Sequence, residues 1–125
     1  FFDNVNKEIK RNYLNEDDKN KKIRVILDNN LKSFNGLFSY CECIESIYFK
    51  RFNRNDFEDI SEMFYGCSTL KNLNLANFKT DNVINMSSMF KFCSSVQTLN
   101  LSNFIKYKRY VWWMFVIKRI IFIQF

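Results

Sequence analysis

Four cysteines are the residues of this chain best suited to chemistry, and three of them recur at a fixed interval. Cys41, Cys67 and Cys93 stand 26 residues apart, and Cys43 lies close to the first. A zinc site built on cysteine needs CxxC-type pairs, completed by a second pair or by histidine. The chain has no histidine, and only one residue separates Cys41 from Cys43. We therefore expect no metal site but a column of buried structural thiols, with a disulfide as the alternative.

The carboxylates form two groups, and neither has the neighbours that catalysis or calcium binding requires. Residues 16–18 lie in the polar stretch NEDDKNKK, which lacks the glycine-containing pattern of an EF-hand loop. The second group lies where the first turns of a helix are expected, and comprises Asp56, Glu58, Asp59 and Glu62. GxGxxG, P-loop and GxSxG patterns are absent, as is any nucleophile–base pair. We expect neither an enzyme nor a cofactor.

The cysteines belong to a repeat that spans most of the chain. The stretch SEMFYGCSTLKNLNLANF at residues 61–78 returns as SSMFKFCSSVQTLNLSNF at residues 87–104. A more divergent copy, LFSYCECIESIYFKRF, occupies residues 37–52 and keeps apolar residues at the matching positions. In the middle copy these are Met63, Phe64, Cys67, Leu70, Leu73, Leu75 and Phe78. Three copies at one spacing indicate repeat units that share a continuous core.

Each unit combines two kinds of apolar spacing. In LKNLNLANF the leucines at 73 and 75 alternate with small polar residues, which predicts a strand with one buried face. In DNVINMSSMFKFC the apolar residues follow steps of three, three, one and three, which predicts a short helix. We interpret the Met-Phe stripe of that helix as core, not as a ligand site. The predicted fold class is α/β, a leucine-rich-repeat-like solenoid of strand–turn–short helix units with a short parallel sheet.

Three regions follow from this pattern. Residues 1–30 are predicted to form an N-terminal cap helix and a first strand, the strand in KKIRVILDN and the helix carrying Phe2, Val5, Ile9 and Tyr13. Residues 31–104 hold three 26-residue units, and 105–125 form an atypical apolar, basic tail. The tail is interpreted as a degenerate last unit. Its alternatives are the frameshifted end of a longer array and, less favoured, a membrane-surface segment.

The charge distribution argues against two classes of partner. The net charge is +6, but the tail holds five basic residues and no acid, while the remaining chain balances 14 basic against 13 acidic residues. A nucleic-acid-binding protein carries a basic stripe on its folded face, so nucleic-acid binding is not expected. Lys118 and Arg119 interrupt the apolar tail, which is shorter than the roughly 20 residues of a membrane-spanning helix.

Self-association through this uncapped apolar end is expected.

The stretches LKNLNLANF, MSSMF and CSSVQTLNLSNF resemble the 26-residue repeats of BspA-like leucine-rich-repeat surface proteins, the DUF285 type, over about residues 31–104. The resemblance implies a solenoid, a surface-exposed or secreted location, a role in adhesion or partner binding, and no catalytic residues. The opening FF followed by Asp3 is not the apolar run that a signal peptide needs, so we expect none within this chain. The usual leucine-rich motif has asparagine where this chain has Phe78 and Phe104, while Asn77 and Asn103 come one residue earlier. We expect a phenylalanine spine in place of the asparagine ladder.

The residues that alternate with the strand leucines are predicted to form the binding face. They are Ser46, Tyr48, Lys50, Asn72, Asn74, Thr98, Asn100 and Ser102. Solenoids use such extended faces to bind partners. The predicted function is a non-enzymatic protein-binding or adhesion module of a surface-exposed or secreted protein, whose partner the sequence does not identify. The alternative is a decayed or truncated structural fragment without a ligand of its own.

Overall fold

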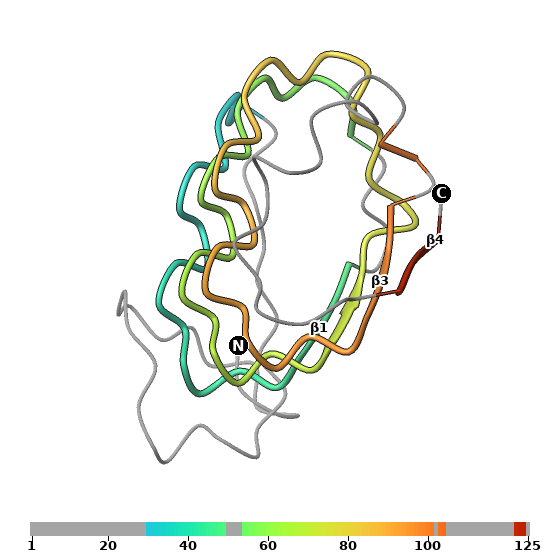
Figure 1. Ribbon diagram of the computed structural model, residues 1–125. Coiled ribbons are helices and arrows are strands. Elements are labelled where there is room, and N and C mark those ends of the chain that lie inside the picture. The colour runs from blue at the N-terminus through green and yellow to red at the C-terminus, as the bar shows by residue number, and fades with distance from the viewer. Residues whose placement is uncertain (1–29, 50–53, 102, 105–121, 125) are drawn as a thin grey trace, which may run out of the picture.

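The computed structural model describes residues 30–49, 54–101 and 103–104, and the backbone of 122–124. It contains the strands β1 (Ser46–Tyr48), β2 (Asn72–Asn74), β3 (Thr98–Asn100) and β4 (Phe122–Gln124). These form one parallel sheet in the order β1-β2-β3-β4. Figure 1 shows the repeat units as loops of similar outline, each lying on the next, with the strands on one side. The short parallel sheet of the predicted fold class is therefore confirmed.

The sheet register follows the repeat. Ile47 lies opposite Leu73, and Leu73 lies opposite Leu99, so each step along the sheet equals one 26-residue unit. The step to β4 differs, because Leu99 pairs with Ile123 and the step is 24 residues. The predicted cap over residues 1–30, Asn30 excepted, and the tail before β4 lie outside the described residues. Among the residues described, no helix is long and apolar enough to cross a membrane.

The predicted short helix does not form in the described part of the chain. Residues 61–66 and 87–92 form consecutive turns instead. Two positions in every unit have a left-handed backbone, with φ between 55° and 71°: Gly36, Glu62 and Ser88 at the first, and Tyr40, Gly66 and Phe92 at the second. A right-handed helix requires negative φ at every residue, so a left-handed residue every fourth position excludes it. The apolar spacing that predicted a helix comes from these turns.

Every second backbone N–H of the turns donates to the neighbouring unit, while the N–H groups between them donate within their own turn. The amide of Glu62 donates to the carbonyl of Ser87 at 2.9 Å, and the amide of Phe64 donates to that of Met89 at 3.0 Å. The previous pair of units repeats the pattern, with Gly36 donating to Ser61 at 3.0 Å. A helix would use these N–H groups within one unit, whereas here they join neighbouring units. The stack is thus tied together by this ladder as well as by the sheet (Figure 1).

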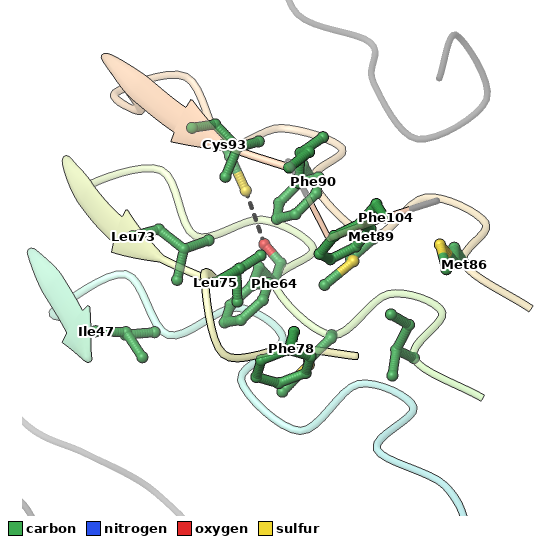
Figure 2. Packing of buried hydrophobic residues seen from close by; sticks show 14 of the residues in the cluster. Ile47, Phe64, Leu73, Leu75, Phe78, Met86, Met89, Phe90, Cys93 and Phe104 are labelled. Carbon is green, nitrogen blue, oxygen red and sulfur yellow. Dashed lines mark hydrogen bonds between the residues drawn. The ribbon is translucent and has the colours of Figure 1, made fainter. Parts of the chain in front are cut away.

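The core lies between the sheet and the turns, and it is built from columns of equivalent residues. Phe64 stacks almost parallel on Phe38 and on Phe90, with ring centroids 5.7 Å apart in both pairs. Met63, Phe64, Met86, Met89 and Phe90 are buried, which confirms that the Met-Phe stripe is core. Figure 2 shows Phe64, Met89 and Phe90 within this core. Full burial of one such side chain contributes about 1.5–3 kcal/mol. Because the ring of Phe64 contacts both neighbouring units, stability depends on having adjacent units.

An asparagine and a phenylalanine occupy adjacent positions shortly after β2 and again after β3. Phe78 and Phe104 are both buried, as a phenylalanine spine predicts. Phe78 also packs edge-on against Phe49 of the preceding unit, with centroids 4.6 Å apart. Asn77, however, donates its side-chain amide to the carbonyl of Phe49 in the preceding unit at 3.4 Å. Asn103 donates its side-chain amide to the carbonyl of Ala76, also in the preceding unit but one position further along the repeat. The expectation that a spine replaces the asparagine ladder is therefore wrong, because the structure contains both.

Candidate functional site

The exposed face of the sheet is the first candidate site. In β1, β2 and β3 the central residue is buried and its two neighbours are exposed. Six predicted binding residues therefore lie together on one face, at matching positions of three neighbouring strands: Ser46, Tyr48, Asn72, Asn74, Thr98 and Asn100. Lys50 and Ser102 lie outside the described residues. Tyr48 is 69% exposed and supplies the large apolar surface of this face.

Some polar groups of this face already hold each other in place. The amide of Asn72 donates to the hydroxyl of Ser46 at 3.2 Å, across the β1–β2 pair. The side-chain oxygen of Asn74 accepts from the backbone N–H of Ala76 at 2.9 Å, which shapes the turn after β2. Lys71 and Glu45 form an exposed ion pair of 3.0 Å beside the strands. The face is a fixed polar surface that can hydrogen-bond a partner but holds no reactive pair.

The cysteine column lies inside the stack. Cys67 and Cys93 are buried free thiols, and Cys41 is a half-buried one. Cys67 donates to the carbonyl of Phe38 and Cys93 to that of Phe64, both at 2.9 Å. Burial raises the pKa of Cys67 and of Cys93 to about 12, which keeps both thiols protonated and unreactive at neutral pH. This agrees with the structural-thiol interpretation. Three metal-ligating side chains do not lie together anywhere in the described part of the chain.

The acidic residues at 56–62 stabilise turns and inter-unit contacts and do not begin a helix. Asp56 accepts from Arg54 at 2.8 Å and from Lys32, one unit earlier, at 2.9 Å. The hydrogen bond from Arg54, which has the larger effect, and the one from Lys32 hold the pKa of Asp56 well below its usual range. Asp59 accepts from both the backbone N–H and the hydroxyl of Ser61, at 2.8 and 2.6 Å. The predicted helix-dipole role is therefore wrong, and residues 16–18 lie outside the described residues.

A second exposed surface was missed by the sequence reasoning. Tyr40 is 65% exposed and Phe92 is 51% exposed, and Tyr65 lies half-buried in contact with both rings. We call Tyr40, Tyr65 and Phe92 the aromatic row. Tyr40 and Phe92 stand two repeats apart, and Gly66 occupies the same position in the unit between them. The recurrence of an aromatic residue after 52 residues could have indicated this surface. The prediction of a short helix over these positions obscured it.

Parallel strands one repeat apart, joined by backbone ladders, define a repeat protein whose 26-residue units stack in register. The family described as "Mycoplasma protein of unknown function, DUF285" matches residues 8–115, so the chain belongs to this family. The DUF285 part of the resemblance is thus confirmed, while its BspA-like surface-protein part stays a prediction. No curated protein and no solved structure matches the chain.

Proposed function

We propose that this chain is a segment of a leucine-rich-repeat-like solenoid that binds a protein partner through the exposed face of its sheet. The proposal includes no catalytic step, because the sequence carries no nucleophile–base pair. It also includes a surface-exposed or secreted location, which rests on the resemblance of the repeats alone. The partner is a protein, because side-chain amides, hydroxyls and an exposed tyrosine suit a polar protein surface.

One observation carries this proposal: the three strands present six exposed side chains in a regular grid. A parallel register holds equivalent positions at the spacing of neighbouring strands, about 4.8 Å. Tyrosine is enriched at the energetic centres of protein interfaces, and Tyr48 stands exposed in this grid. The bond from Asn72 to Ser46 reduces the rotamer freedom that binding would otherwise have to remove.

The proposal is tested by affinity capture with the purified full chain. Surface proteins extracted from the producing cells are passed over the immobilised parent and over two variants, Tyr48→Ala and Asn74→Lys. Lys79→Ala is the matched control, because Lys79 is exposed but lies outside the strands. We expect at least one protein to bind the parent and the control and to be lost from both variants.

Urea unfolding of each variant checks that the fold is retained, since Asn74 also shapes the turn at Ala76. Equal recovery of every bound protein on Tyr48→Ala, Asn74→Lys and the parent would remove the sheet face as the binding site. If nothing binds the parent specifically, the alternative of a structural fragment without its own ligand is favoured.

A further inference from the structure

The aromatic row forms a continuous ring contact across three units. The rings of Tyr40 and Tyr65 meet at 5.2 Å and those of Tyr65 and Phe92 at 5.3 Å, both edge to face. This arrangement is the one that aromatic quadrupoles favour. Tyr40 and Phe92 nevertheless keep more than half of their surface exposed. The row is therefore an ordered apolar surface, separate from the sheet face of the proposed function.

Folding alone does not account for large side chains at these positions. Tyr40 and Phe92 have a left-handed backbone, with φ of 57° and 65°, a conformation that bulky residues seldom adopt. The middle unit has Gly66 at the same position, with φ of 71°. Glycine meets the backbone requirement without strain. An exposed ring at a strained backbone position is an outlier of the kind that points to recognition.

The row carries opposite charges at its two ends. Glu42 and Glu62 are exposed carboxylates beside Tyr40 and Tyr65, because the backbone amide of Glu42 donates to the carbonyl of Tyr40 at 2.8 Å and that of Tyr65 donates to the carbonyl of Glu62 at 2.9 Å. Lys91 holds its ammonium group over the rings of Tyr65 and Phe92, at 5.9 and 5.3 Å. Within the described part of the chain, these three charged groups form no ion pair with one another.

We propose that two copies of this chain pair through their aromatic rows, antiparallel about a two-fold axis near Tyr65. This arrangement places Phe92 and Lys91 of each copy against Tyr40 and the carboxylate end of the other. A two-fold interface requires a surface that is complementary to itself, and a row with one acidic and one basic end meets that requirement. Complementary charges set the orientation of the pair, while the rings supply its apolar core.

Analytical ultracentrifugation of the full chain over a concentration series tests this pairing. We expect a monomer–dimer equilibrium whose dissociation constant rises with salt, because the charged ends are exposed. Lys91→Glu and Glu62→Lys should each raise that constant at least tenfold, because each places like charges opposite one another. Combining the two substitutions should restore a constant within about threefold of the parent value, since a salt bridge of reversed sense then forms.

Two further variants separate the rings from the rest of the surface. Phe92→Ser should weaken the dimer at least tenfold, whereas Tyr48→Ser, on the sheet face, should leave it unchanged. Circular dichroism and urea unfolding verify that each variant is folded. A monomer at every concentration overturns the proposal. A dimer whose dissociation constant is unchanged in Lys91→Glu and in Phe92→Ser also overturns it, because such a dimer would form through another surface such as the tail. A double variant as weak as the single ones also overturns the antiparallel arrangement.

Discussion

The thiol of Cys93 donates a hydrogen bond to the carbonyl oxygen of Phe64, 2.9 Å away in the preceding unit (Figure 2). Cys67 makes the equivalent bond to Phe38. In both cases the acceptor lies 29 residues before the donor, so the bond crosses from one unit to the one below. The repeated cysteine thus fills a small buried site and joins two units, a role that needs a donor of limited size.

Replacing Cys93 by alanine should lower the free energy of unfolding by about 1–2 kcal/mol. The substitution removes a fully buried side chain and its bond to Phe64. Urea unfolding followed by circular dichroism measures the change. Cys43→Ala is the matched control, because Cys43 is only half-buried and no hydrogen bond of its thiol occurs in the described residues. An equal loss in both variants would contradict the inter-unit role.

Stability should fall as the pH rises from about 9 towards 12. Burial raises the pKa of Cys67 and of Cys93 from the ordinary 9.0 to about 12. Between these values the unfolded chain has released thiol protons that the folded chain still holds. The stabilising contribution is therefore complete below pH 9 and is lost with rising pH.

The measurement is urea unfolding at several pH values, for the parent and for the double variant Cys67→Ala, Cys93→Ala. Lysine and tyrosine titrate in the same range, so the difference between the two proteins isolates the thiols. We expect the parent to have the steeper decline. If the free energy of unfolding fell equally with pH in both proteins, the two thiols would ionise as readily in the folded chain as in the unfolded one.

Asp56 should stabilise the fold at neutral pH and not in acid. Arg54 and Lys32 hold the pKa of Asp56 below its ordinary value of 3.8. The folded chain therefore keeps the carboxylate charged at a pH where the unfolded chain protonates it. This contribution is present above about pH 4 and disappears as the pH falls further. The stability difference between the parent and Asp56→Asn should narrow from pH 7 to pH 2, and a constant difference would argue against the ion pairs.

Gly66 should tolerate alanine less well than Gly36. Both glycines have positive φ, 71° and 62°, so alanine at either position is strained by about 1–2 kcal/mol. At Gly66 an added Cβ would also lie 2.7 Å from Cδ1 of Tyr40, whereas at Gly36 the nearest atom is 3.8 Å away. Thermal and urea unfolding should show the larger loss for Gly66→Ala. Adding Tyr40→Ala should recover the excess, and failure to recover it would place the strain elsewhere.

The repeat itself could be predicted because its signal is one of residue type. Leu73 and Leu99 recur with polar neighbours, and burial of one strand face demands this alternation wherever strands pair in register. The Met-Phe stripe and the cysteine column could be predicted as core because residues of the same type recur there one unit apart. The six sheet-face residues were placed correctly on one exposed surface, while their role in binding stays a prediction.

The helix could not be excluded by the same reasoning, since steps of three, three, one and three fit consecutive turns as well as a helix. Glu62, Ser88 and Phe92 adopt the left-handed backbone without glycine, so residue type did not mark these turns. The asparagine ladder was missed because Asn77 reaches the carbonyl of Phe49 from a shifted position. The shorter, 24-residue step from Leu99 to Ile123 could not be predicted, because nearly every residue near Ile123 is apolar and no single spacing stands out.

By itself, then, the sequence determined which residues are buried and that the units stack at intervals of 26 residues, because apolar pattern controls burial. Only the tertiary structure decided the backbone path between the strands, because the amides of residues such as Glu62 and Phe64 bond to the neighbouring unit. Those bonds are absent from any single repeat. The aromatic row also arises only on stacking, which brings Tyr40, Tyr65 and Phe92 from three units into contact.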